Sequence, residues 1–370
     1  MKRSPHPLFP LALSAINDTI NQRNIMREEI IKDLPLLDQR GQIIKEGWAR
    51  HPHWQYDSKL AKLNKVKLKE WDFYTIINQS KKYAVSAGIG RVGLSNVVYV
   101  SYVDFNQQFI NHAHKTWSYI FKRSNLGYNW GKDHGIAVSK PPLRASFISK
   151  GDIFRIIFAD SSLILPDGRK GLDVNLELRK PEHMETLNIA TKFYDHKKQF
   201  FLTKKANGLR CSGIIRRGLK KEIIEKNTTF AVMDRGRGNG NYHGFWYWIS
   251  LSFMQGSIPL GLDLSYSEED TSFSGENAIF VNTTIFKLDT LEVKIPKDPT
   301  KEKWSIDSGE QLSMTFTPIV TKNSHMQSQI GYSEDTKQYG AFSGFIMVQQ
   351  QKKFTFTNIL GFTEKFLNRQ

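Results

Sequence analysis

The chain has 370 residues, of which 39% are hydrophobic, 12% are aromatic and 24% are charged, and its formal net charge is +16. This composition is that of an ordinary globular protein and excludes a wholly disordered chain. The single cysteine, Cys211, excludes an intrachain disulfide, which fits a reducing compartment, so we expect a cytoplasmic protein.

Residues 1–33 differ from the rest of the chain. Apolar positions between residues 11 and 20 predict one short amphipathic helix within an N-terminal appendage. The basic start followed by a short apolar stretch has features of a signal peptide, but Pro7 and Pro10 interrupt the apolar part. No run approaches the roughly 20 apolar residues that a membrane-spanning helix requires.

Period-two alternation dominates after residue 33. Leu172–Leu178, Leu260–Tyr266 and Gln311–Thr317 each place apolar side chains on one face and polar ones on the other. This pattern predicts strands with one buried face. Val97–Phe105 is apolar on both faces, which predicts a strand covered on both sides. Arg217–Lys226 is the one later segment that predicts a short helix.

Turn signals such as Pro166-Asp167-Gly168 and Asn207-Gly208 separate these runs. Many strands, short turns and few short helices predict an all-β fold of two tandem antiparallel barrels or sheets. We expect an N-terminal appendage at residues 1–33, a first β domain at 34–210 and a second at 211–370.

Met233–Phe253 is the densest set of candidate functional residues. Asp234-Arg235-Gly236-Arg237-Gly238 opens a glycine-rich stretch that we expect to be a tight turn. A nucleotide-binding loop is excluded, because the following Phe245–Phe253 alternates as a strand, whereas such a loop needs a helix. One face of this strand is apolar, and the other combines indoles with hydroxyl groups.

We expect the mixed face of that strand, with Trp246, Trp248 and Ser250, to line a ligand site together with Arg237. Indoles offer flat apolar area and serine offers a polar contact, which suits an amphipathic or unsaturated ligand. On this interpretation the indoles face open space in a β-barrel. The alternative is that both tryptophans are ordinary core packing.

Two carboxyl groups, those of Asp234 and Glu276, are candidates for a general acid. A carboxyl group donates a proton near neutral pH only where burial keeps it protonated. We expect Arg237 to form an ion pair with Asp234, three residues away, and so to fix the loop. Such a contact would stabilise the ionised form of Asp234 over the protonated form that a general acid requires. The alternative for Glu276 is a solvated turn residue.

Other binding partners are less well supported by the sequence. His112-Ala113-His114 places two imidazoles on one strand face, but no third ligand of matching spacing stands out, so we expect no metal and no cofactor. The positive charge fits a solvated surface or contact with an anionic membrane surface. The basic run Lys59–Lys69 lacks interleaved aromatic residues on its basic face, so we expect no nucleic-acid binding. The oligomeric state stays open.

Together these motifs resemble a widespread family classed as a domain of unknown function, and the match runs from Leu36 to the C-terminus. The resemblance is carried by Leu36-Leu37-Asp38, Gly47-Trp48-Ala49-Arg50, Lys69-Glu70-Trp71-Asp72-Phe73-Tyr74, Asp234-Arg235-Gly236-Arg237-Gly238, Trp246-Tyr247-Trp248, Gly275-Glu276-Asn277, Phe342-Ser343-Gly344 and Gly361-Phe362-Thr363-Glu364-Lys365. The family looks distantly similar to carotenoid hydratase (hydroxyneurosporene synthase), to tocopherol cyclase and to lipocalin-like Diels–Alderases.

The resemblance implies tandem lipocalin-like domains with a ligand site between or inside them. It implies binding of a hydrophobic, isoprenoid or lipid-like small molecule and, if the protein is an enzyme, acid-promoted hydration or cyclisation of an alkene with a proton from Asp234 or Glu276. Arg237 argues against that chemistry, because a fixed positive charge disfavours a carbocation. Arg235 stands where the family usually has tryptophan, which makes the pocket more polar. The alternative is a non-catalytic structural or interaction protein with a filled core.

Overall fold

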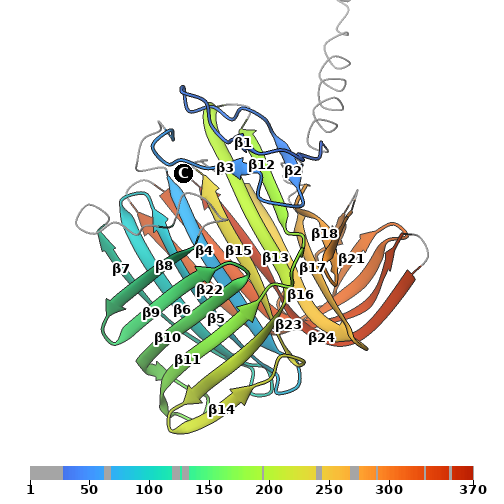
Figure 1. Cartoon of the computed structure of the whole chain (residues 1–370). Coiled ribbons are helices and arrows are strands. Elements are labelled where there is room, and N and C mark those ends of the chain that lie inside the picture. Colours follow the sequence, from blue (N-terminus) through green and yellow to red (C-terminus); the bar gives the residue numbers. More distant parts are fainter. Residues whose placement is uncertain are drawn as a thin grey trace, which may run out of the picture.

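The computed structural model describes residues 28–61, 68–118, 126, 133–193, 196–238, 244–266, 275–288, 291–328, 331–349 and 352–369. These residues form two large antiparallel sheets and one small two-stranded sheet (Figure 1). They include no α-helix, and hence none long and apolar enough to cross a membrane. The expected all-β fold with two barrel-like sheets is confirmed.

The first sheet is a nearly closed barrel. Its main path is β7-β6-β5-β4-β15-β13-β11-β10-β9-β8; β12 and β14 also pair with β13, and β2 pairs with β12. The side-chain amide of Asn111 on β7, one end of the path, donates to the carbonyl of Ile164 on β10 (3.0 Å), two strands from the other end. The strands are β2 (Gly47–Ala49), β4 (Lys69–Asn78), β5 (Tyr83–Val92), β6 (Ser95–Asp104), β7 (Phe109–Ser118), β8 (His134–Lys140), β9 (Leu143–Lys150), β10 (Ile153–Ile164), β11 (Lys170–Arg179), β12 (Leu187–Phe193), β13 (His196–Arg217), β14 (Lys220–Ile224) and β15 (Thr229–Gly238).

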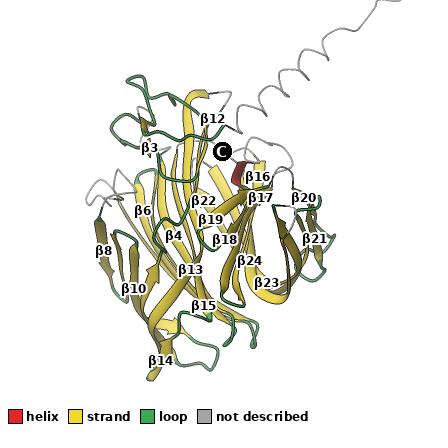
Figure 2. Cartoon of the chain, turned by 45° about the vertical axis from the view of Figure 1, so that its right-hand side comes forward, coloured by secondary structure: helices red, strands yellow, loops and turns green. Residues whose placement is uncertain are grey.

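The second sheet is a half-barrel that lies beside the first (Figure 2). Its order is β19-β18-β17-β16-β24-β23-β22-β21-β20, so β19 and β20 are the edges. The strands are β16 (Gly244–Gln255), β17 (Ile258–Tyr266), β18 (Ala278–Val281), β19 (Thr284–Lys287), β20 (Glu292–Lys294), β21 (Trp304–Ser308), β22 (Leu312–Ser328), β23 (Gly331–Val348) and β24 (Lys352–Arg369). The small sheet pairs β1 (Leu34–Pro35) with β3 (Trp54–Gln55).

Several expected elements take a different form. Arg217–Lys226 is not a helix: the chain turns at Gly218, and β14 pairs with the end of β13. The helix expected near residues 11–20 lies outside the described residues. The expected domain division at 210/211 falls within β13, and the change from one sheet to the other occurs between Gly238 and Gly244.

Asn207-Gly208 is a β-bulge inside β13 rather than a turn between strands. Gly208 has φ +74°, and the pairing of β13 with β15 shifts between Ala206 and Leu209. Because of the one extra residue, Ala206 and Leu209 both face the core of the first barrel. The bulge also docks on the second sheet, since the Asn207 amide donates to the carbonyl of Leu262 (2.6 Å).

A third apolar cluster joins the two sheets. It combines Ile77 and Val103 of the first sheet with Trp248, Tyr339 and Phe362 of the second. By contrast, the alternate β16 residues Tyr247, Ile249, Leu251 and Phe253 belong to the apolar core of the half-barrel. Both faces of β16 are therefore covered, one by its own half-barrel and one by the first sheet.

The side chain of Gln79 extends the line of hydrogen bonds between two strands of the second sheet, β16 and β24. Gln79, in the turn after β4, donates to the carbonyls of Ser252 on β16 (2.9 Å) and Leu360 on β24 (2.8 Å). Its Oε1 accepts from the Leu360 amide (2.9 Å). These bonds lie just beyond the Leu251–Gly361 pair, where the direct pairing of β16 with β24 ends.

Candidate functional site

Asp234 lies in the middle of β15, and its side chain faces the second sheet. Trp71 Nε1 donates to Asp234 Oδ2 (2.7 Å), and Thr203 Oγ1 donates to Oδ1 (3.3 Å). The residue is 9% exposed. Burial raises the pKa of Asp234, and nearby Glu276 adds to this rise, while Lys205 and the Trp71 hydrogen bond oppose it. Asp234 is thus a buried carboxyl group biased toward its protonated form.

Lys205 connects Asp234 to the second sheet. It pairs directly across from Asp234 in the β13–β15 ladder. Its Nζ lies 3.1 Å from Asp263 Oδ1 and 3.0 Å from Glu276 Oε2. Burial alone would lower the pKa of Lys205, but these two carboxyl groups raise it above its usual value. A single buried ammonium group therefore pairs with Asp263 and Glu276, and the charge of Asp234 acts on it as well.

Asp263, on β17, is the third acid of this network. Trp248 Nε1 donates to its Oδ1 (3.0 Å), and burial raises its pKa to about 7. Its Oδ2 has no hydrogen-bond partner among the described residues. Glu276 differs, because Ser265 Oγ donates to the same Oε2 that meets Lys205 (2.8 Å). The solvated-turn alternative for Glu276 does not hold, since the residue is 5% exposed.

Trp248 lies between two lysines at the interface of the sheets. Lys205 Nζ is 4.7 Å and Lys337 Nζ is 5.2 Å from its ring centroid. Lys337 also pairs with Glu364 (2.8 Å) and lies over the ring of Phe362 (4.1 Å). Trp248 therefore faces the first sheet rather than the inside of its own half-barrel, and cationic groups pack against its ring.

The other two members of the mixed β16 face have different surroundings. Trp246 is half-buried and stacks on Phe366 of β24, with ring centroids 4.8 Å apart. Ser250 is fully buried; its Oγ donates to the carbonyl of Leu262 (3.0 Å) and accepts from the Asn207 amide (2.8 Å). Ser250 thus fastens the β13 bulge to the second sheet.

Arg237 does not pair with Asp234. The glycine-rich stretch around them is strand β15 as far as Gly238, and residues three apart on a strand point to opposite faces. Arg237 faces the inside of the first barrel, where its Nη2 lies 2.9 Å from Asp72 Oδ1 and also donates to the carbonyl of Leu126 (2.8 Å). The expected ion pair is wrong, because we expected a tight turn where a strand continues.

The sequence interpretation missed Lys205, Asp263 and Trp71. Asp263 occupies a polar position of a strand with one apolar face, so it counted as solvent-facing. Lys205 follows Lys204 in a polar stretch just before the expected domain division at residues 210/211. The usable signal was the alternation of Leu260–Tyr266, which gives Asp263 and Ser265 one common face.

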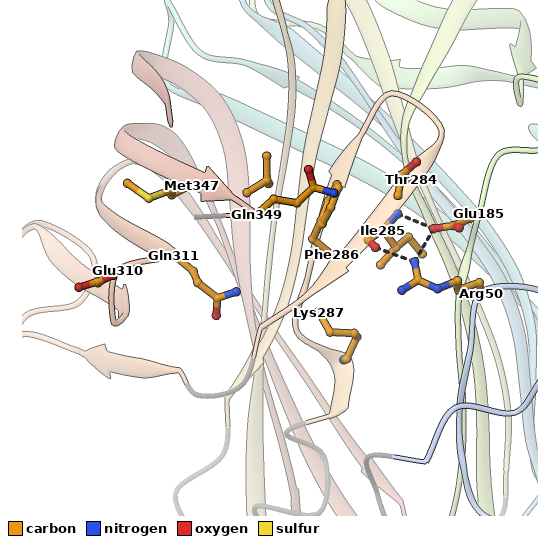
Figure 3. Close-up of a pocket in the computed structure, with 11 residues that line it drawn as sticks. Arg50, Glu185, Thr284, Ile285, Phe286, Lys287, Glu310, Gln311, Met347 and Gln349 are labelled. Carbon is orange, nitrogen blue, oxygen red and sulfur yellow. Dashed lines mark hydrogen bonds and ion pairs between the residues drawn. The ribbon is translucent and has the colours of Figure 1, made fainter. Parts of the chain in front are cut away.

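A separate cleft of about 850 Å³ opens where the second sheet meets the N-terminal part of the first (Figure 3). Arg50 closes one side: its Nη1 donates to Glu185 Oε2 (2.7 Å) and to the carbonyl of Ile285 (2.7 Å). Phe286 of β19 and Met347 of β23 supply apolar lining. A volume of this size falls within the range of small-molecule sites.

The chain belongs to the family described as Domain of unknown function (DUF2804), whose model matches residues 27–370. This result confirms the family expected from the motifs. No functionally curated protein matches the chain.

Solved structures share the fold at low sequence identity. A candidate AttH protein from Nitrosomonas europaea has a TM-score of 0.51 and 13% identity, over 84% of this chain and 96% of its own. CghA, determined with the compound Sch210972, has a TM-score of 0.51 and 11% identity, over 82% and 89%. Kievitone hydratase from Nectria haematococca has a TM-score of 0.47 and 12% identity, over 80% and 88%. The first two likenesses establish the tandem β architecture.

Proposed function

We propose that the protein binds a hydrophobic, isoprenoid or lipid-like small molecule between its two sheets, next to Asp234. The observation that carries the proposal is the buried Asp234 carboxyl group with its raised pKa, held by the half-buried indole of Trp71. Phe73 and Trp246 are further half-buried rings on the facing strands. CghA, of similar fold, was determined with a bound compound, which supports a ligand role for this architecture.

The chemistry that suits this site is acid-promoted hydration or cyclisation of an alkene. Asp234 would transfer its carboxyl proton to one alkene carbon, so that the π bond breaks and a C–H bond forms. Water, or a second alkene of the same molecule, would attack the resulting cation. The proton then lost would return to the Asp234 carboxylate, which restores the acid. Proton transfer of this kind contributes a factor of about 10² to 10⁴ in rate.

Lys205 does not rule out a cationic intermediate. Its charge is balanced by Asp263 and Glu276, both within 3.1 Å of its Nζ. Arg237, which the sequence placed beside Asp234, lies on the opposite face of β15. A cation near Asp234 would therefore meet less uncompensated positive charge than the sequence interpretation implied.

A non-catalytic structural or interaction role is the second candidate. It is favoured by the lysines packed against Trp248 and by the hydrogen bonds of Ser250, which make both residues part of the joint between the sheets. On this alternative the acids and lysines serve only to fix the two sheets together. The two candidates differ in whether a ligand binds at all.

The first test is ligand occupancy. Native mass spectrometry of the purified protein, with lipid extraction, should reveal a bound apolar molecule, and geranylgeraniol or oleic acid should quench tryptophan fluorescence saturably. Repeatedly empty protein without quenching would favour the structural role.

The second test separates binding from catalysis. Asp234→Asn removes the proton donor and keeps the shape, so it should bind the ligand within about threefold of the wild type while turnover of an alkene substrate falls at least about 100-fold. Asp173→Asn, on β11, is the matched control and should leave both unchanged. Equal turnover by Asp234→Asn and the wild type would exclude Asp234 as the acid.

A further inference from the structure

The hairpin that joins β13 to β14 has a leucine at its tip. Gly218 and Leu219 form its two-residue loop, since Arg217 pairs across from Lys220. Gly218 has φ +59°, a positive value that suits the first loop position of a type II′ turn. The second position of such a loop is commonly polar. The geometry of the turn therefore explains the glycine but not the leucine.

Leu219 is completely exposed, with a relative exposure of 101%, so it adds nothing to the packing of the barrel. The turn Gly93-Leu94 joins β5 to β6 with a loop of the same length, and Gly93 also has φ +59°. There the leucine is only 42% exposed. A Gly-Leu turn thus allows its leucine to be partly covered, and the full exposure of Leu219 is a property of this hairpin.

Ile223 of β14 enlarges the apolar surface of the hairpin. It is 70% exposed and pairs across from Ile214 of β13, which is half-buried. Directly paired residues share one face of a sheet, so the two isoleucines lie side by side. A single exposed apolar residue needs no explanation, but apolar residues gathered on one hairpin and surrounded by charged residues indicate an interaction site.

Basic residues surround the apolar tip. The hairpin segment 214–224 contains four basic residues and one acidic residue, Glu222. Glu222 is buried and pairs with Arg217, so its charge is offset on the inner face of the hairpin. The three other basic residues are exposed: Arg216, Lys220 and Lys221. The outer surface of the hairpin therefore combines leucine and isoleucine with positive charge.

The neighbouring turn between β10 and β11 extends this surface. The Gly218 amide donates to the carbonyl of Gly171 (2.8 Å), which holds the tip beside β11. Lys170 is exposed and pairs across from Ile164 of β10, which is 45% exposed. In both views β14 lies at the lower end of the first barrel (Figure 1 and Figure 2). The basic and apolar surface is thus at an end of the molecule, where a broad flat partner can reach it.

We propose that this hairpin docks the protein on an anionic lipid surface, with Leu219 and Ile223 entering the headgroup region and the lysines contacting lipid phosphates. Apolar side chains leave water in that region, and basic side chains meet a negative surface potential. Lysine stems can lie along apolar surroundings while their ammonium groups reach phosphates. A protein partner suits the tip less well, because a stable interface buries about 800 Å² on each side. The proposal does not depend on a ligand at Asp234.

Vesicle flotation of the full chain tests the proposal. Vesicles of phosphatidylcholine with about 30% phosphatidylserine should bind the protein at least about tenfold more tightly than pure phosphatidylcholine. Added salt should weaken the binding, because it screens exposed charges. Leu219→Ser should weaken it at least about tenfold, since the burial of a leucine is lost. Lys220→Gln combined with Lys221→Gln should remove most of the preference for phosphatidylserine.

Leu94→Ser is the matched control, because it changes the leucine of the other Gly-Leu turn. It should leave vesicle binding within about twofold of the wild type. Leu219→Ser should melt at the temperature of the wild type, so that weaker binding cannot be ascribed to unfolding. Wild-type protein that does not float with the phosphatidylserine vesicles, or Leu219→Ser that binds as tightly as the wild type, would overturn the proposal.

A fluorescent label at position 219 distinguishes insertion from adsorption by charge alone. Cys211, the single cysteine, is fully buried, so a nitrobenzoxadiazole maleimide should react selectively at Leu219→Cys. The emission of this label should become stronger and shift to shorter wavelength when phosphatidylserine vesicles are added, whereas a label at Leu94→Cys should not respond. Unchanged emission at position 219 in vesicle-bound protein would overturn insertion of the tip. A dimer that Leu219→Ser dissociates would overturn the lipid assignment in favour of a second copy of the chain.

Discussion

Asp234 and Arg237 stand three residues apart on β15, yet their side chains point to opposite faces of the first sheet. Asp234 joins the acids and lysines between the two sheets, whereas Arg237 joins Asp72 inside the barrel. One strand thus contributes to two buried polar clusters, one rich in carboxyl groups and one rich in cations.

Asp72→Asn should strongly destabilise the protein. The change leaves Arg235 and Arg237 buried without their shared carboxylate, and breaking a buried pair from one side costs about 3–5 kcal/mol. Urea unfolding at neutral pH measures the loss. Asp152→Asn removes a half-exposed carboxylate that pairs with Lys180 and should have a much smaller effect. Similar losses of stability in both variants would show that the buried ion pairs of Asp72 contribute no more than the pair of Asp152 with Lys180.

The acids between the sheets should make stability fall as the pH rises. The pKa of Asp263 is raised from 3.8 to about 7, so between these values the folded state holds a proton that the unfolded state has lost. The contribution of this proton to the free energy of unfolding is complete below about pH 4 and disappears as the pH passes about 7. The pKa of Asp335 is also raised to about 7, so this residue acts in the same direction.

Asp263→Asn should therefore flatten part of this decline. The measurement is the free energy of unfolding in urea at several values from about pH 4 to about pH 7. The acids that remain, including Asp335 and Asp234, should preserve some slope. If the variant and the wild type lose stability in parallel across this range, Asp263 does not hold a proton in the folded state.

Gly236→Ala should displace the indole that holds Asp234. A Cβ at Gly236 would lie 2.0 Å from Cζ2 of Trp71, far closer than any real contact. We expect a loss of about 1–3 kcal/mol and a shift of tryptophan fluorescence as Trp71 moves. Gly135→Ala, on β8, is the matched control: the nearest atom, Cγ1 of Ile148, is 3.8 Å away, so stability should be unchanged or slightly higher. Unchanged fluorescence in Gly236→Ala would contradict this placement of Trp71.

Gln79→Ala should weaken the connection between the sheets. Three hydrogen bonds to the backbone of β16 and β24 are lost, for a total of about 1–3 kcal/mol. Urea unfolding followed by both circular dichroism and fluorescence would measure the loss and show whether the two sheets still unfold together. Gln107→Ala changes an exposed glutamine in the turn between β6 and β7 and should have little effect. A stability loss no larger than that of Gln107→Ala would deny Gln79 its joining role.

The strands could be predicted from the sequence because each buries one face of alternating residues. Leu172, Val174, Leu176 and Leu178 are all buried, as their spacing requires. The pattern cannot show what covers the other face. Asp263 and Trp248 lie on such a face, and they become buried only because the first sheet packs over them.

The candidate site was predictable only in part for the same reason. Asp234 and Glu276 could be singled out as carboxyl groups near glycines, but Lys205, which brings them together, has no local signal. Arg237 was assigned to Asp234 by its proximity in the chain, whereas its partner Asp72 is 165 residues away. Such pairings depend on strand order, which alternation does not encode.

The alternating charges of β15 also constrain how this strand can align during assembly of the sheet. A slip of one residue would turn Asp234 into the barrel and carry Arg235 and Arg237 outward against Lys205. Such a slip exchanges the two faces of a strand. The contacts of Asp234 with Trp71 and Thr203 and those of Arg235 and Arg237 with Asp72 would be lost. Electrostatics thus adds to apolar packing in selecting a single alignment for the strand at the centre of the molecule.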